Sequence, residues 1–267
     1  MSRTADRVRR LLQGLAGTFA TPETEEAKTG LRVGMASHVG PRKRNEDFAA
    51  MSWQADFFAV SDGIGGAPFG DVMSRVACNA AVRAFDEGAD VLEAFAVANE
   101  AASLVSDLLG SRSGATLLLA ERKEWTLRMV TAGDTRAYLW RGGHLEAVTG
   151  TGRAHPNSNA LDKAVGYGLV EPDEAIVDLI VGDRVLLCTD GVWESIDEGC
   201  LCELLGSDDN APLVADNIAW EAARVGNDNC TCICVFVDEA THDNVTPAEG
   251  LGSTTPEADT PTTEFFD

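Results

Sequence analysis

The chain has 267 residues, of which 45% are hydrophobic and 24% are charged, as is ordinary for a globular protein. Its 43 acidic and 21 basic side chains give a formal net charge of −22, which argues against nucleic acid as a partner because a phosphate polymer would be repelled. No apolar run approaches the roughly 20 residues needed to span a bilayer, and the N-terminus lacks the continuous apolar segment of a secretory signal. We therefore expect a cytoplasmic protein without a transmembrane segment.

Three regions follow one another along the chain. Residues 1–30 contain apolar side chains at helical spacing with arginines opposite, which predicts an amphipathic helix and a linker. That helix could dock on the body, on a partner or on an anionic surface. Residues 31–237 form the globular body. Residues 238–267 hold eight acidic residues and no lysine or arginine, so we expect a disordered acidic tail.

Within the body, apolar periodicity predicts helices and strands in separate blocks. Helices are expected at 70–85, 91–110, 197–205 and 211–225. Strands are expected at 31–37, 56–62, 115–120, 125–132, 136–140, 144–148, 175–181, 184–190 and 230–237. Because strands cluster with strands, the pattern favours an α+β fold: a layered α-β-β-α sandwich of two mostly antiparallel sheets flanked by helix pairs.

The seven cysteines do not indicate a metal site. Three of them alternate in the run "CTCIC" at 230–234, which places them on one face of a strand. Neither a CxxC spacing nor nearby histidines accompany them, so we expect buried thiols in a reducing compartment.

Carboxylates stand where apolar segments meet turns. Five aspartates occupy such positions: Asp47, Asp62, Asp134, Asp190 and Asp228. Glu194 lies four residues after Asp190. Each alone is an ordinary turn former, and this plain interpretation suits Asp183 after Gly182. Together they are each able to point into one shared cleft, where unpaired carboxylates would repel and a divalent cation would remove the cost. An all-oxygen set selects Mg²⁺ or Mn²⁺, and Gly63 leaves room for its own carbonyl to approach the ion.

The sequence resembles the metal-dependent Ser/Thr protein phosphatases of the type 2C class, in a bacterial-like form. The resemblance covers residues 31–237 and rests on ordered motifs, which are "GPRKRNEDF", "FFAVSDGIGG", "SGATLLLA", "TAGDTRAYLWRGG", "NALDKAVG", "GDRVLLCTDGVWE" and "DNCTCICV". Residues 31–237 would then be a phosphatase catalytic domain. It would hydrolyse phosphoserine and phosphothreonine in proteins that are targets of a cognate kinase.

The resemblance also implies roles for individual residues. Two ions, Mn²⁺ or Mg²⁺, would be held by four carboxylates and one carbonyl, those of Asp47, Asp62, Asp190, Asp228 and Gly63. Asp62 would bridge the ions, and Glu46 would act behind the ligands. Asp134, Asp190 and Glu194 match the positions of a third, weaker ion in bacterial members. The phosphate-binding cation would fall on Lys43, with Arg42 beside it. A water between the ions would then attack phosphorus without a phosphoenzyme.

Three departures from the family pattern bear on the chemistry. Ile64 replaces a histidine proposed as general acid in many eukaryotic members, and His38 stands where aspartate is common. Only "GTGRA" separates Thr149 from His155, where relatives carry a longer flap beside the active site. We therefore expect a more open cleft that accepts small phosphoesters. Two alternatives remain: a phosphatase-like binding module with little activity, and a two-metal nuclease, which conflicts with the net charge.

Overall fold

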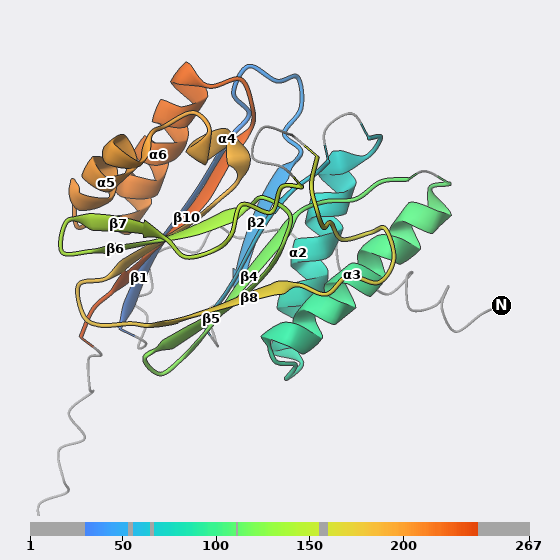
Figure 1. Cartoon of the computed structure of the whole chain (residues 1–267), viewed down its shortest axis with the longest axis horizontal. Helices are drawn as coiled ribbons and strands as arrows, with labels where there is room; N and C mark the ends of the chain where they lie inside the picture. Colours follow the sequence, from blue (N-terminus) through green and yellow to red (C-terminus); the bar gives the residue numbers. More distant parts are fainter. Residues whose placement is uncertain (1–29, 53–55, 65–66, 111, 155–159, 240–267) are drawn as a thin grey trace, which may run out of the picture.

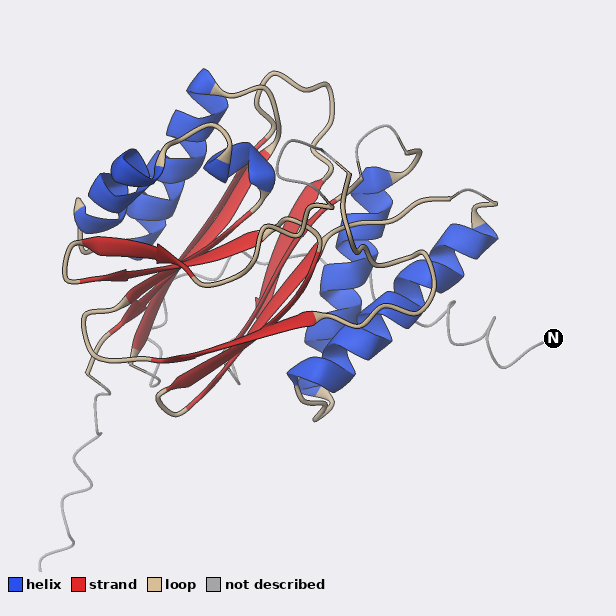
Figure 2. Ribbon diagram, in the orientation of Figure 1, coloured by secondary structure: helices blue, strands red, loops and turns tan. Residues whose placement is uncertain are grey.

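The computed structural model describes residues 30–52, 56–64, 67–110, 112–154 and 160–239. Two antiparallel sheets lie face to face, with helices on both outer faces (Figures 1 and 2). The predicted α-β-β-α sandwich is confirmed. The helix and linker expected within 1–29, and most of the expected tail (240–267), lie outside the described residues.

Each sheet has five strands. The first has the order β1-β10-β9-β6-β7, with bounds Leu31–His38, Cys230–Val237, Arg184–Cys188, Arg136–Arg141 and His144–Ala147. The second has the order β2-β3-β4-β5-β8, with bounds Asp47–Ser52, Phe57–Asp62, Leu117–Lys123, Thr126–Ala132 and Asp173–Asp178. The chain crosses from the second sheet to the first between β5 and β6, so the Gly133–Asp134 turn joins the two sheets.

The helices form two groups. On one side, α2 (Gly70–Asp86) and α3 (Val91–Leu108) cover the second sheet; on the other lie α4 (Asp190–Trp193), α5 (Glu198–Gly206) and α6 (Ala211–Val225) (Figure 1). Side-chain caps explain why several begin where they do. Asp90 forms a capping box with Glu93 at the start of α3, and Asn210 accepts from the Leu213 N–H at 3.1 Å at the start of α6.

Burial on both faces explains the continuous apolar runs. In β3, Phe57 packs toward α2 and α3, whereas Phe58 packs into the layer between the sheets. In β10, Cys232 and its alternating neighbours Cys230 and Cys234 face α6, and Ile233 faces the other sheet. A strand covered on both sides gains from apolar side chains at every position. These three thiols are buried, as predicted, whereas Cys200 and Cys202 in the segment 198–206 are only partly buried.

The structure differs from the sequence prediction in three elements. The strand β2 was not expected, because "DFAAMS" is short and mixed in character. The helix α4 was missed because it has only four residues. The strand predicted at 175–181 is found as β8 at Asp173–Asp178, an exposed edge strand in which acidic side chains replace the usual apolar signal. Within the ranges described, no helix combines the length and apolar character needed to cross a membrane.

We expect Gly34→Ala to destabilise the fold by about 1–3 kcal/mol, the usual cost of overpacking. A Cβ at Gly34 would stand 2.2 Å from the Ala211 carbonyl oxygen and 2.4 Å from the Pro212 nitrogen, so β1 and α6 would have to separate. Urea unfolding measures the loss. Gly150→Ala is the matched control, because a Cβ there meets nothing within 4 Å. Equal stabilities for the two variants would contradict this account of the packing.

Candidate metal centre

The first two predicted ligands face each other across the β2–β3 pair. Asp47 begins β2, Asp62 ends β3, and the antiparallel register places them directly opposite. Asp47 is 3% exposed, and its Oδ2 accepts a 2.8 Å hydrogen bond from the Thr189 hydroxyl, which follows β9 in the other sheet. The Asp62 N–H donates to Thr116 Oγ1 at 2.8 Å. Both sheets therefore fix this pair of carboxylates.

The next two ligands come from the neighbouring strands β9 and β10. Asp190 begins α4 just after β9, and Asp228 lies two residues before β10. A Cβ on Gly191 would stand only 1.8 Å from the Asn229 carbonyl oxygen, so glycine is required where these backbones meet. This close approach brings Asp190 and Asp228 to the same place.

Asn229 is a positioning residue that the sequence did not reveal. Its buried amide nitrogen donates to the carbonyls of Val39 and Arg44, at 2.8 and 2.9 Å, and its Oδ1 accepts from the Glu46 N–H at 2.9 Å. One side chain thus holds the loop before β2 against the start of β10. Its place immediately after Asp228 is the only signal that the sequence offers.

Gly63 is required by packing. Its N–H donates to the Glu46 carbonyl at 3.1 Å, and a Cβ on it would stand 2.4 Å from backbone atoms of Gly70 at the start of α2. The Glu46 carboxylate lies beside Gly70 as well. Burial, then the nearby Asp71 carboxylate, raises the pKa of Glu46. The predicted approach of the Gly63 carbonyl to an ion stays a prediction.

Burial and repulsion between neighbouring carboxylates raise the pKa values within this group of aspartates. Burial raises the pKa of Asp47 to about 6 and that of Asp190 to about 7. It also raises the pKa of Asp62 well above its ordinary value, with repulsion from Asp47 and Asp190 adding to the effect. Repulsion from Asp228 contributes to the rise at all three. Such a cluster gains strongly from added positive charge.

Two arginines already supply part of that charge. Arg42 Nη2 donates to Asp228 Oδ2 at 2.6 Å, and its Nε donates to the Asn227 carbonyl at 3.0 Å. The predicted phosphate-binding residue Lys43 is exposed on the same loop. On the other flank, Arg153 contacts Asp134 and Asp190. The sequence did not single out Arg153, because it lies in a loop without periodicity.

The donor types fit hard divalent cations. The four aspartates supply only oxygen. His38, which stands where aspartate is common in relatives, is exposed and accepts a hydrogen bond from the Gly40 N–H at 3.0 Å. As the described side chains stand, no three carboxylates, imidazoles or thiols converge into a ready metal shell. Two of these carboxylates already have partners, because the Thr189 hydroxyl donates to Asp47 and Arg42 donates to Asp228. Binding an ion requires these carboxylates to turn toward it.

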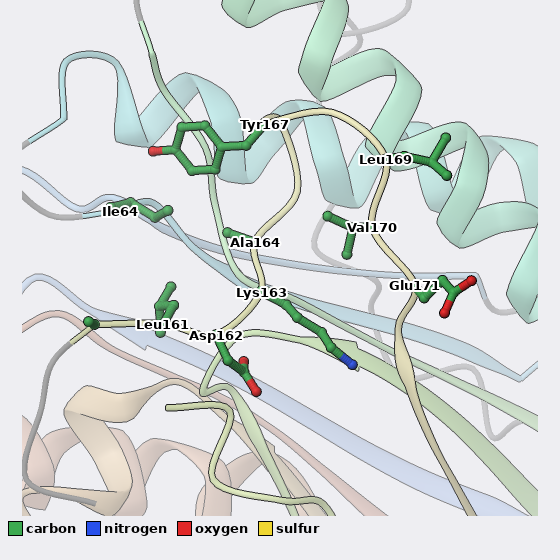
Figure 3. A pocket seen from close by; sticks show the side chains of 10 residues that line it. Ile64, Leu161, Asp162, Lys163, Ala164, Tyr167, Leu169, Val170 and Glu171 are labelled. Atoms are coloured by element: carbon green, nitrogen blue, oxygen red, sulfur yellow. The ribbon is translucent and has the colours of Figure 1, made fainter. Parts of the chain in front are cut away.

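A pocket of about 630 Å³ adjoins the centre. Ile64, which directly follows the Asp62–Gly63 turn, contributes to its wall, and segment 160–171 supplies the rest (Figure 3). Leu161 and Tyr167 offer apolar surface, whereas Lys163 is paired with Asp173 at 2.5 Å. The pocket therefore has both apolar and charged walls, next to the turn that carries Asp62.

Comparison with known proteins identifies relatives across most of the chain. The family model described as stage II sporulation protein E (SpoIIE) matches residues 56–228. The serine/threonine protein phosphatase PstP of Mycobacterium tuberculosis is 27% identical over 223 residues, covering 73% of this chain and 43% of that protein. This chain therefore spans less than half the length of that relative.

Two further similarities extend over nearly the whole length of the matched chains. The serine/threonine phosphatase stp of Listeria monocytogenes is 28% identical over 231 residues, covering 74% of this chain and 92% of that protein. The solved catalytic domain of PstP in complex with two manganese ions is 27% identical, with a TM-score of 0.70, covering 78% of this chain and 99% of that chain.

We expect the metal-free chain to melt at a lower temperature at pH 8 than at pH 5.5. The pKa values of about 6 for Asp47 and about 7 for Asp190 lie above the value near 4 of an unfolded aspartate. The native state therefore binds more protons than the unfolded state in this window, and stability falls as pH rises through it. Thermal unfolding of metal-stripped protein measures the slope, which Asp190→Asn should reduce. Greater stability at pH 8 would contradict the prediction.

Proposed function

The chain belongs to the SpoIIE family of type 2C-like domains, and from this premise we propose that it is a metal-dependent protein phosphatase acting on phosphoserine and phosphothreonine. The observation that carries the proposal is that Asp47, Asp190 and Asp228, each from a different strand end, lie near enough to Asp62 for their repulsion to raise its pKa. The names of the similar proteins and the two manganese ions in the related catalytic domain support it.

The residues of this chain would have separate roles in binding the metal ions and in hydrolysing the phosphate ester. Two bound divalent cations would supply an acidified water and stabilise charge on the phosphoryl oxygens. The residues that would hold the ions are Asp47, Asp62, Asp190 and Asp228, together with the carbonyl of Gly63. Glu46 would support this set of ligands, because its backbone carbonyl accepts a hydrogen bond from the Gly63 N–H.

Recognition of the phosphate would fall to the loop before β2. Lys43 is exposed there, and the guanidinium of Arg42 already reaches the edge of the carboxylate cluster at Asp228. Arg42 can bind a phosphoryl oxygen pair as a planar fork, whereas Lys43 offers a point charge. The substrate chain beyond the phosphate would lie in the pocket beside Ile64. The substrates would be targets of a cognate kinase, and the segment at 1–30 would be available to dock a partner.

We expect Asp190→Asn to lower Mn²⁺-dependent hydrolysis of a phosphothreonine peptide by more than about 100-fold, because it removes a ligand shared within the cluster. Phosphate release with added Mn²⁺, and again with a chelator, measures this. The matched control Asp216→Asn changes an exposed carboxylate of α6 and should retain full activity. If the wild-type chain bound Mn²⁺ but hydrolysed no phosphopeptide, the alternative of a phosphatase-like binding module would replace the proposal.

We also expect ready turnover of p-nitrophenyl phosphate, because the short segment between Thr149 and His155 would leave the approach to the carboxylates open. Steady-state kinetics should give a KM for this small ester at or below the millimolar range. A much higher KM for the small ester, together with efficient turnover of a phosphoprotein, would contradict the open cleft.

A further inference from the structure

The guanidinium of Arg153 lies among the three carboxylates expected to hold a third ion. Its Nε donates to Asp134 Oδ2 at 2.8 Å, and its Nη2 lies 2.5 Å from Glu194 Oε1 and 3.5 Å from Asp190 Oδ2. The side chains of Arg153 and Asp134 are only 10% and 5% exposed. One planar cation thus contacts every member of the expected third-ion set.

The backbone conformation at Gly152 and a bridge to Leu161 fix the position of Arg153. Gly152 has φ of +61°, and a Cβ on it would stand 1.8 Å from the Gly133 carbonyl oxygen and 2.8 Å from the Asp134 nitrogen. Only glycine allows this approach, which sets Arg153 beside Asp134. Arg153 also pairs with Leu161 in an antiparallel bridge. Because Leu161 lines the pocket, the same residue connects the pocket wall to the carboxylates.

Trp193 holds the guanidinium from a further direction. The Arg153 guanidinium carbon lies 4.7 Å from the centre of the Trp193 ring, and Trp193 Nε1 donates to the Asp134 carbonyl at 3.0 Å. The guanidinium carbon of Arg136 lies 3.4 Å from the centre of the same ring. Stacking on an indole favours a guanidinium in a fixed orientation.

These contacts leave no place for a third divalent ion. An ion bound by Asp134 and Glu194 would compete with Arg153 for the same oxygens and would stand next to a cation that cannot lose its proton. Displacing the guanidinium would leave a buried charge without its partners, which is strongly unfavourable. The donors exist, but they are already satisfied.

We propose that Arg153 takes the place of the third ion, so that this chain holds two divalent cations and supplies the remaining positive charge itself. The inference rests on the two-ion centre of the proposed function. Arg153 acts as a positioning residue, because it reaches the reacting centre only through Asp190.

Metal stoichiometry of the full chain tests this independently of activity. Equilibrium dialysis against saturating Mn²⁺, followed by elemental analysis, should give about two ions per wild-type chain and about three per chain for Arg153→Ala. The matched control Arg83→Ala removes an exposed arginine of α2 that pairs with Glu87, and it should stay at two. A melting curve verifies that each variant is folded.

The outcomes separate the two proposals. Three ions in the wild type, or two in folded Arg153→Ala, would overturn the role of Arg153 and leave the phosphatase proposal standing. No saturable Mn²⁺ binding by the wild type would overturn the two-ion centre itself. If Arg153→Ala does not fold, electron paramagnetic resonance of the wild type titrated with Mn²⁺ decides, since two bound ions support the inference and three refute it.

Discussion

Burial of like charges is the constraint on which the rest of the structure depends. Burial raises the pKa of Asp47, Asp62 and Asp190, and repulsion from neighbouring carboxylates, Asp228 among them, adds to the rise at each. Two arginines at the edges of the group compensate part of this negative charge: Arg42 pairs with Asp228, and Arg153 lies beside Asp190. At the centre, Asp47 and Asp62 lie directly opposite each other, and burial raises the pKa of both. Added divalent charge would relieve this cost, so metal binding and stability would be linked.

The two-sheet architecture makes this crowding possible. The strands that carry Asp47 and Asp62 belong to one sheet, and those next to Asp190 and Asp228 belong to the other. Thr189 crosses the gap by donating to Asp47. Close approaches at glycine, such as Gly191 against Asn229, then bring backbones nearer than any side chain would permit. Packed strand ends therefore fix the backbone from which each carboxylate projects, and only the side chains have to turn toward an ion.

The sequence predicted the parts of this arrangement that depend on local pattern. Doubly buried strands such as β3 and β10 are continuous apolar runs, and the aspartates at their ends could be recognised as a set. Contacts between distant segments could not be predicted. Arg153 and Asp134 are 19 residues apart in chain and meet through a loop, so no periodicity marks the pair. Likewise, the three hydrogen bonds of the Asn229 side chain reach positions 183 to 190 residues away. The expectation of a third ion came from matching carboxylates alone, without the arginine that satisfies them.

Charge on the loop before β2 would reconcile an acidic chain with the anionic substrate that we propose. A net charge of −22 repels a phosphate group at long range, but at physiological ionic strength screening limits that repulsion to about 8 Å. Within that distance the approach is governed by Arg42, Lys43 and Arg44, three consecutive exposed cations. Arg42 pairs with Asp228, and the Arg44 carbonyl accepts a hydrogen bond from Asn229. These contacts hold the basic loop beside the carboxylates. Attraction therefore acts only on a phosphate that has already entered the site, which favours selection by local fit over steering from a distance.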